Sequence, residues 1–470
     1  MKILLINPPF DFSIQSCQPK ILEEGLDFLP PLGLMSIASY IEKYTSHNVE
    51  ILDAQVEQLG YEQIRLEIIK KQPDVVGVTA MTFTILDVIA LAKLVKQINP
   101  EIKIIVGGPH ALIYPEETMA IKEIDYLIMG EGEMVIKDLL NNLGNYPELK
   151  KIRGIAFREN GQIITTGRTD FISDLDSLPF PARRLTPYKK YFSVVSSNAP
   201  VTTMFSSRGC PYKCLFCDRP QVGKNFRARS AKNVVDEMAE CAKLGIKEIF
   251  FYDDTFAADR QRVLDICSEI KRRKITIAWD IRTRVNTVDE ELLGAIKDAG
   301  CQRIHYGVEA GTQKILNVLR KGITLEQAEK AFFLTKKADI ETAAYFMIGS
   351  PTETRQDIQE TIKFMKKLDP DYVHITIVTP FPATDLYRLA MEEKVVSGDP
   401  WKDFAKNPSS DFVPPVWEKE LPREELFALL KKAYRSFYLR PKFVIKKLVR
   451  LKSSQELLNK TRAAFKLLKI

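Results

Sequence analysis

The chain has 470 residues, 45% of them hydrophobic and 27% charged, with a formal net charge of +7. This length corresponds to about three domains, and the composition is that of a globular protein with a sizeable core, which excludes disordered and collagen-like chains. The sequence contains no run of about 20 apolar residues, which argues against a multi-span membrane protein. The opening apolar run, residues 3–6, is too short for a secretory signal, so we expect a cytoplasmic protein.

The first 140 residues alternate short apolar runs with amphipathic stretches. We predict strands over 2–6, 49–53, 75–79, 103–106 and 125–129 and helices over 32–44, 62–71 and 85–98. Strands that alternate with helices pair in parallel, because each crossover helix returns the chain to the same edge. The pattern therefore predicts a doubly wound, Rossmann-like α/β domain over residues 1–140.

The ligand site of such a sheet lies beyond the carboxyl ends of its strands. At those ends the sequence has the hydroxyls of Thr79 and Thr82 and the pair Gly107–Gly108, and glycines let a backbone approach a ligand closely. The alternative is that the glycines only form a tight turn. No G-x-G-x-x-G pattern follows the first strand, which argues against a nicotinamide cofactor.

Residues 141–198 are predicted to be a connector with a small hairpin that turns at Asn160-Gly161. Six more strands follow, near 201–205, 248–252, 277–281, 303–308, 341–348 and 373–378, with helices between them. Six such repeats exceed one doubly wound half and indicate a partial (β/α)6 barrel over residues 199–395. Residues 396–470 are predicted to form a helical, basic carboxyl-terminal region.

Three of the seven cysteines, Cys210, Cys214 and Cys217, form a C-x3-C-x2-C motif directly after the first barrel strand. An odd number of cysteines argues against a disulfide framework. Closely spaced thiolates are the soft ligands of iron–sulfur clusters, and three of them leave one iron of a four-iron cluster without a protein ligand. A zinc site that uses Asp218 as its fourth ligand is the alternative.

The motif and its place in a β/α barrel resemble the radical S-adenosylmethionine (radical SAM) superfamily. The resemblance implies that the three cysteines hold a [4Fe-4S] cluster and that the open iron chelates SAM. One electron then cleaves SAM to a 5'-deoxyadenosyl radical. The resemblance also implies that Phe216, which precedes the last cysteine, packs by the adenine.

Polar residues at later strand ends agree with this resemblance. Asp253 stands where the family contacts the methionyl amine, Arg284 ends the third barrel strand, and Glu309 resembles the family's ribose-binding or amine-binding acid. Each alone is equally typical of a solvated strand end, and only their order along the chain favours cofactor binding. At three turns where the family often has glycine, the chain has Ser350, Thr352 and Ala383.

The doubly wound domain ahead of the barrel resembles that of the cobalamin-binding group of the superfamily. The resemblance implies that the 79–82 turn and Gly107–Gly108 hold the nucleotide tail of the corrin. The loop after the first strand, residues 7–10, contains no histidine, so cobalt would lack the usual imidazole ligand. We expect His110 to be a hydrogen-bonded turn histidine. A domain that recruits substrate without binding cobalamin is the alternative.

The domain order is similar to that of anaerobic magnesium-protoporphyrin monomethyl ester cyclases and hopanoid-tailoring enzymes. We therefore expect a cobalamin-dependent enzyme that methylates or otherwise modifies an unactivated carbon of a hydrophobic small molecule, a lipid or a tetrapyrrole, with a one-electron donor such as flavodoxin or ferredoxin. Oxidative cyclisation, ring rearrangement and a non-catalytic scaffold are alternatives. RNA modification is less favoured because related RNA-modifying enzymes have a second cysteine triplet where this chain has only Cys17. No catalytic side chain is singled out.

Basic charge is concentrated in the tail. Residues 431–470 contain thirteen Lys or Arg and one acid, Glu456, a net charge of +12, which leaves −5 for the other 430 residues. Residues 424–468 combine these cations with apolar side chains at helical spacing. Such helices can settle on an anionic membrane surface or pack as a lid on the barrel with their lysines solvated. Binding to nucleic acid, whose phosphates basic patches neutralise, is a third and less favoured alternative.

Overall fold

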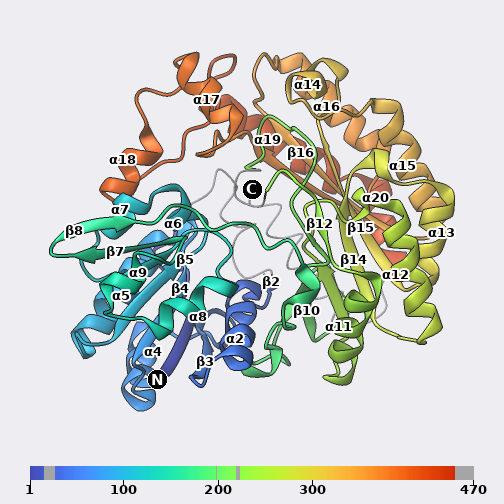
Figure 1. Ribbon diagram of the computed structural model, residues 1–470. Helices are drawn as coiled ribbons and strands as arrows, with labels where there is room; N and C mark the ends of the chain where they lie inside the picture. The colour runs from blue at the N-terminus through green and yellow to red at the C-terminus, as the bar shows by residue number, and fades with distance from the viewer. Residues whose placement is uncertain (15–26, 197, 219–222, 450–470) are drawn as a thin grey trace. The chain divides into compact units, whose positions relative to one another are not determined.

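The computed structural model describes residues 1–14, 27–196, 198–218 and 223–449 (Figure 1). The chain forms two compact units. The first contains the amino-terminal strand, Phe28–Tyr191 and Asp399–Val413, and the second contains Phe192–Gly398 and the chain from Pro414 onwards. No described helix combines the length and apolar character needed to cross a bilayer.

The first unit is built on a seven-stranded sheet of order β3-β1-β4-β5-β6-β7-β8. The first five strands of this order pair in parallel and the last two pair antiparallel. The strands are β1 (Lys2–Asn7), β3 (Asn48–Asp53), β4 (Val75–Thr79), β5 (Lys103–Gly107), β6 (Tyr126–Ile128), β7 (Ile155–Glu159) and β8 (Gln162–Thr165). The predicted doubly wound domain is confirmed. The hairpin β7–β8, which the sequence places in the connector, extends this sheet.

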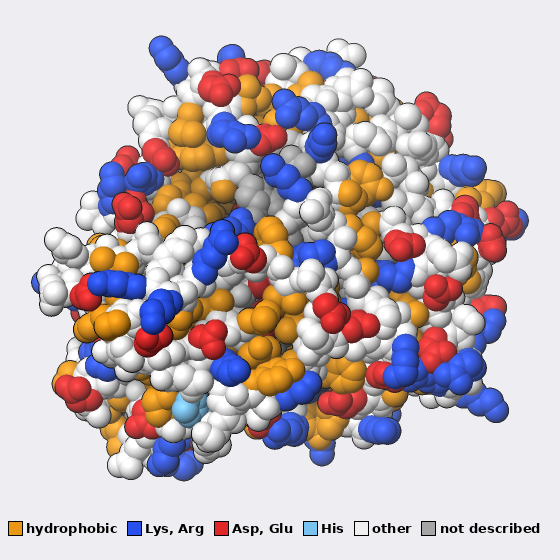
Figure 2. All heavy atoms as spheres, in the orientation of Figure 1, with side chains coloured by type: hydrophobic (Ala, Val, Ile, Leu, Met, Phe, Trp, Pro, Cys, Tyr) orange, Lys and Arg blue, Asp and Glu red, His pale blue; other side chains and the backbone are white. Residues whose placement is uncertain are grey.

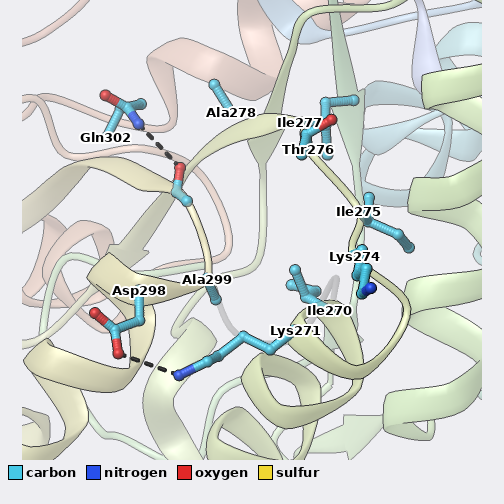
Figure 3. Close-up of a pocket in the computed structure, with 11 residues that line it drawn as sticks. Ile270, Lys271, Lys274, Ile275, Thr276, Ile277, Ala278, Asp298, Ala299 and Gln302 are labelled. Atoms are coloured by element: carbon cyan, nitrogen blue, oxygen red, sulfur yellow. Dashed lines mark hydrogen bonds and ion pairs between the residues drawn. The ribbon is translucent and has the colours of Figure 1, made fainter.

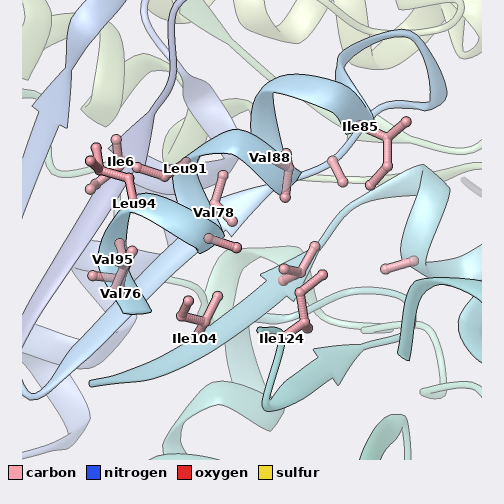
Figure 4. Packing of buried hydrophobic residues seen from close by; sticks show 14 of the residues in the cluster. Ile6, Val76, Val78, Ile85, Val88, Leu91, Leu94, Val95, Ile104 and Ile124 are labelled. Atoms are coloured by element: carbon pink, nitrogen blue, oxygen red, sulfur yellow. The ribbon is translucent and has the colours of Figure 1, made fainter. Parts of the chain in front are cut away.

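Helices cover both faces of the first sheet because its central strands are apolar on both sides; β1 is buried at five of its six residues. The helices are α2 (Leu32–Tyr44), α3 (Ala54–Glu57), α4 (Tyr61–Lys71), α5 (Ile85–Ile98), α6 (Pro109–Ile113), α7 (Pro115–Met119), α8 (Glu133–Asn141), α9 (Tyr146–Leu149) and α18 (Pro400–Lys406). One side of the core is drawn in Figure 4, where α5 packs its apolar face, including Val88 and Leu91, on β1, β4 and β5.

The second unit is built on six parallel strands in sequential order, β10-β13-β14-β15-β16-β17. They are β10 (Val201–Met204), β13 (Glu248–Phe251), β14 (Ala278–Thr283), β15 (Cys301–Glu309), β16 (Glu341–Ile348) and β17 (Tyr372–Ile377). Figure 1 shows them as one curved sheet. The predicted partial barrel is therefore confirmed, and its strands agree with the predicted ones within about two residues.

Helices follow each barrel strand. They are α11 (Ala231–Lys243), α12 (Arg260–Arg272), α13 (Glu290–Asp298), α14 (Gln313–Val318), α15 (Leu325–Lys337), α16 (Arg355–Leu368) and α17 (Asp385–Glu392). All begin at a Ser, Thr or Asp whose side chain accepts a hydrogen bond from a backbone N–H of the first turn, which satisfies one of the donors left free there. Each strand–helix junction is thus specified locally.

The carboxyl-terminal helix α19 (Arg423–Tyr438) closes the edge of the barrel sheet. Tyr434 donates a hydrogen bond to the carbonyl of Ile375 and accepts one from its N–H, both at 3.0 Å. Tyr438 does the same to Val373 at 2.8 and 2.9 Å. The two phenols, one helical turn apart, thus satisfy the free backbone groups of edge strand β17.

The apolar face of α19 is also buried, with Leu426, Leu429, Leu430 and Phe437 at most 7% exposed. For this helix the packed-lid interpretation is confirmed. In α20 (Pro441–Val449), by contrast, Val444 and Ile445 are 42% and 61% exposed. Residues 450–470, which carry six of the thirteen cations of the predicted membrane-binding pattern, lie outside the described residues. On the face drawn in Figure 2, basic and acidic side chains are interspersed.

Candidate active site at the carboxyl ends of the barrel strands

The cysteine motif lies in the loop that follows β10. Two short strands, β11 (Ser207–Arg208) and β12 (Arg227–Ala228), flank the motif in the sequence and pair antiparallel. Leu215, between the second and third cysteines, donates its N–H to the carbonyl of Leu319 at 2.9 Å and accepts from the N–H of Leu386 at 2.9 Å. The middle of the motif is thus fixed to the residue that follows α14 and to the first turn of α17.

The three thiols lie close enough to affect one another electrostatically. Burial, together with negative charge at Cys214 and Cys210, raises the pKa of Cys217 to about 12. Crowded thiolates need a cation to offset their repulsion, and an iron–sulfur cluster supplies one iron to each. The donor chemistry therefore fits the predicted cluster. Among the described residues, no three His, Cys, Asp or Glu side chains are arranged to hold a single metal ion.

Arg284 contacts the cysteine motif directly. Its guanidinium donates to Sγ of Cys214 at 3.3 Å and lies 3.9 Å from the ring centre of Tyr212. It also donates to the carbonyl of Lys321. Arg284 is only 5% exposed, so it places a positive charge against the thiolates where water screens it little.

A buried ion pair stands beside this arginine. Nζ of Lys321 lies 2.6 Å from Oε1 of Glu309, and both side chains are less than 10% exposed. Nζ also lies 6.0 Å from the ring centre of Phe216. A Cβ on Gly307 would fall 2.4 Å from Glu309 Oε1, so glycine is needed there for the pair to form. Phe216, Arg284 and Glu309 are thus brought together with Cys214, and Lys321, which the sequence did not single out, links them.

Asp253 occupies a different position. Its carboxylate accepts from the N–H and hydroxyl of Ser206, at 2.7 and 2.5 Å, and from the hydroxyl of Ser207 at 2.5 Å. Arg262 lies 3.7 Å away, and Asp253 is 0% exposed. The structure therefore uses Asp253 to hold the start of the cysteine loop. Its neighbour Asp254 is exposed.

Two of the three turns where family members often have glycine keep a left-handed backbone. Thr352 has φ of 63° and Ala383 has φ of 64°. An L-residue pays roughly 1–2 kcal/mol for this conformation. The turn geometry thus survives without glycine at these positions.

In the first unit, the predicted rim residues meet at the ends of β4 and β5. Gly108 has φ of 97°, and a Cβ there would fall 2.7 Å from Oγ1 of Thr79. The N–H of Ala80 donates to the carbonyl of Gly107 at 2.8 Å. Only glycine lets these two turns approach so closely, so Thr79, Gly107 and Gly108 form one surface.

The sheet order of this unit reverses between β1 and β4, which is where doubly wound domains bind their ligands. Two large apolar side chains are exposed in the loops after these strands, Phe10 at 61% and Met81 at 49%. Asp87 holds the first loop by accepting from the N–H of Phe12 at 3.0 Å and the hydroxyl of Ser13 at 2.7 Å. A fixed rim with exposed apolar side chains fits a large, partly apolar cofactor such as a corrin.

His110 lies behind this rim and is fully buried. Its Nδ1 lies 3.2 Å from Oγ1 of Thr82, so the histidine is hydrogen-bonded as predicted, although it lies in the short helix α6 and not in a turn. Burial lowers the pKa of His110 to about 4, so the ring is neutral at physiological pH. Its Nε2 has no hydrogen-bond partner among the described residues.

A pocket of about 420 Å³ opens at the amino-terminal ends of the barrel strands, the end opposite the cysteine loop (Figure 3). It is lined by the end of α12 and the starts of β14 and β15, with Lys271 paired to Asp298 at 3.2 Å. Enzymes of this architecture react at the carboxyl ends of the strands. The pocket is therefore separate from the site of the cysteines.

Comparison with known proteins agrees with both predicted domain types. Residues 204–365 match the model of the radical SAM superfamily, and residues 21–140 match that of the B12 binding domain. An uncharacterised methyltransferase of Pyrococcus horikoshii is 38% identical over 95% of this chain and 94% of its own. The anaerobic magnesium-protoporphyrin IX monomethyl ester cyclase of Rubrivivax gelatinosus is 30% identical over 88% and 75%, respectively. The hopanoid C-3 methylase of Methylococcus capsulatus is 26% identical over 87% and 76%.

Solved structures show the same fold. The cobalamin-dependent SAM radical enzyme OxsB, with aqua-cobalamin bound, superposes with a TM-score of 0.75 at 18% identity over 99% of this chain and 72% of its own. The two family models and the extended identity to relatives place the protein in one family. The chain belongs to the cobalamin-binding branch of the radical SAM superfamily, whose cofactors are a [4Fe-4S] cluster, SAM and cobalamin.

Proposed function

We propose that this protein is a methyltransferase that modifies an unactivated carbon of a hydrophobic small molecule, a lipid or a tetrapyrrole. The contact of Arg284 with Cys214, beside the Lys321–Glu309 pair, carries the proposal, because it joins the cluster ligands to the expected SAM contacts. The methyltransferase name of a relative that matches nearly the whole chain supports methyl transfer. The tetrapyrrole and hopanoid in the names of two others support the substrate class.

Each residue of the barrel site has a separate role in this proposal. Cys210, Cys214 and Cys217 hold the cluster, and the Arg284 guanidinium stabilises the negative charge on the thiolates. Phe216 packs by the adenine. Glu309, with Oε1 bound to Lys321, keeps Oε2 to accept a hydrogen bond from the SAM ribose or amine.

Two further contacts complete the cofactor sites. Asp254, exposed where Asp253 is enclosed, is the acid at this strand end that can reach a ligand. In the first unit, Thr79, Thr82 and Gly107–Gly108 hold the nucleotide tail of cobalamin. When bound, the cofactors supply one-electron cleavage of SAM and a carrier for the methyl group. We place the reaction in the cytoplasm with a flavodoxin or ferredoxin as electron donor, because an odd number of cysteines argues against a disulfide framework.

Anaerobic reconstitution tests this proposal. The protein should bind about four irons and one cobalamin per chain and cleave SAM when reduced. Cys214→Ala should lose the iron, whereas Cys267→Ala, which removes a buried thiol on α12, should retain it. The compound that accumulates in cells lacking the gene is then supplied with methyl-deuterated SAM. A product heavier by one deuterated methyl supports the methyltransferase, and ring closure without mass gain supports the oxidative cyclase instead.

For the tail, we propose a peripheral membrane contact through α20 and the residues that follow. The exposure of Val444 and Ile445 next to Lys442 supports this proposal, because apolar side chains flanked by cations are typical of interfacial helices. A chain ending at residue 440 should lose binding to vesicles containing phosphatidylserine. Equal binding by the full and shortened chains would remove the proposal.

A further inference from the structure

Below the cofactor contacts, the inner face of the barrel carries a second group of polar side chains. Alternate residues of a strand share a face. Asp280 and Arg282 of β14 therefore face the same side as Arg284, which directly follows the strand. On β15, His305 faces the same side as Gly307, where a Cβ would fall 2.4 Å from Oε1 of Glu309. Adjacent side chains on one face are about 7 Å apart along a strand. This group thus lies on the cofactor face, one to two steps deeper in the barrel.

Asp280 and His305 form a continuous hydrogen-bonded chain with Tyr345 of the next strand, β16. Nε2 of His305 lies 3.1 Å from Oδ2 of Asp280, and its Nδ1 lies 2.9 Å from the phenol oxygen of Tyr345. Asp280 and His305 are buried, whereas Tyr345 is only partly buried. The chain therefore runs from an enclosed carboxylate to a tyrosine that is only partly buried.

The charges fix the direction of these hydrogen bonds. A carboxylate only accepts, so the imidazole must carry its proton on Nε2. Burial lowers the pKa of His305, which keeps the ring neutral and leaves a lone pair on Nδ1. Tyr345 must then donate its single proton to Nδ1. Its oxygen consequently presents lone pairs, not a proton, to whatever occupies the barrel.

Arg282 lies next to this phenol. Its charge and hydrogen bonding oppose the rise that burial causes in the pKa of Tyr345 and of Tyr252. Its guanidinium lies 3.8 Å from the ring centre of Tyr252 and donates to the carbonyl of Phe251 at 3.1 Å. No carboxylate within the described residues forms an ion pair with Arg282. Its charge is therefore available to stabilise a phenolate at Tyr345.

We propose that Tyr345 is a general base that takes a proton from the bound substrate, with His305 and Asp280 as the positioning residues behind it. The inference rests on the proposed function and deepens it: the substrate carries an O–H or N–H group at or beside the carbon that is modified. The arrangement follows the logic of a catalytic triad, in which a carboxylate orients a histidine that receives the proton of a hydroxyl.

The step balances without an added reagent. The substrate O–H or N–H bond breaks, and its proton bonds to the Tyr345 oxygen. The proton of Tyr345 passes to Nδ1 of His305. The imidazolium is paired with Asp280, and no electron is gained or lost. The groups that face this step are Asp280 and Arg282 of β14, Arg303 of β15, His374 of β17 and, after β13, Tyr252.

Histidine spectra test the relay without any substrate. The sequence has only four histidines, so nitrogen NMR of 15N-histidine-labelled protein resolves each ring. The native protein should show His305 protonated on Nε2 alone. Asp280→Asn offers an N–H₂ donor to Nε2 and should move the proton to Nδ1, as the equivalent change does in triads. An unchanged tautomer in Asp280→Asn would overturn the inference.

Turnover tests the role of Tyr345, with the compound that accumulates in cells lacking the gene as substrate. Tyr345→Phe should lower the ratio of product to 5'-deoxyadenosine about a hundredfold or more, the usual share of a general base. The matched control is Tyr306→Phe, a buried tyrosine of β15 whose hydroxyl bonds to Thr335 at 2.8 Å and whose loss should leave that ratio unchanged. Native turnover should fall in acid only below pH 6.5, as His305 becomes protonated.

The outcomes separate the two proposals. A native protein that holds iron but never cleaves SAM contradicts the proposed function, and the histidine spectra still decide the relay. An unchanged product ratio in Tyr345→Phe contradicts the general base, whatever the cofactors do. An equal loss in Tyr345→Phe and Tyr306→Phe would reduce Tyr345 to a packing residue and also overturn the inference.

Discussion

Asp253→Ala is the most informative single change in the barrel, because it decides whether this carboxylate holds the loop or binds SAM. Its removal leaves the N–H of Ser206 and two serine hydroxyls without their acceptor. An unsatisfied buried group costs about 1–3 kcal/mol, and a buried cation such as Arg262 that loses its partner costs about 3–5 kcal/mol. Because these costs overlap and water can enter the space, we expect about 4 kcal/mol less stability for the second unit.

Urea unfolding of the metal-free protein, followed by tryptophan fluorescence, measures this loss because Trp279 and Trp417 are buried in the second unit. Asp253→Asn keeps one acceptor and should lose about half as much. The matched control is Asp265→Ala, an exposed site on α12 where substitution should change stability by less than about 0.5 kcal/mol. Unchanged stability in Asp253→Ala, together with loss of SAM binding, would show that Asp253 is a direct ligand and refute our reasoning.

Three further changes give separate tests. Arg284→Met removes the donor to Cys214. It should lower the midpoint potential of the cluster, because a cation beside the thiolates favours the more negative, reduced state. An unchanged potential in an electron paramagnetic resonance titration would contradict this expectation. Tyr434→Phe leaves both backbone groups of Ile375 unpaired and should cost about 2 kcal/mol in urea unfolding, whereas exposed Phe333→Leu should cost little. His110 in the folded protein binds no proton until the pH nears 4, whereas in the unfolded chain it binds one below about pH 6.5. The free energy of unfolding of the first unit should therefore fall by up to about 3 kcal/mol as the pH falls from 6.5. His110→Gln should remove this pH dependence.

Much of the fold was predictable because its signals are local. Apolar runs located the barrel strands, and the cysteine spacing located the cluster loop. The Asn160-Gly161 dipeptide predicted its hairpin correctly, and both residues have positive φ. These features depend on neighbours in the sequence, which a reader of the sequence can see.

The rest depends on contacts between distant residues. Asp253 and Asp254 are adjacent and chemically identical, and only the alternation of a strand end decides which one is enclosed. Lys321 follows no motif, and its role exists only because α14 brings it back to Glu309. Trp401 is fully buried in the first unit, 5.8 Å from the ring of Phe83, although more than 300 residues separate them. No pattern within the helix around Trp401 indicates which unit it joins.

The edge of strand β17 can be covered only after α19, with Tyr434 and Tyr438, has been synthesised. When β17 has emerged from the ribosome, about 60 residues remain before Tyr438 is available, which is roughly 3–12 s at usual elongation rates. During this interval the last strand has an uncovered edge that can pair with another nascent chain. Premature termination upstream of α19 would therefore yield a product that has nearly all its cofactor contacts but is prone to aggregate. The resistance of this protein to aggregation thus depends on a helix that carries none of the cofactor contacts.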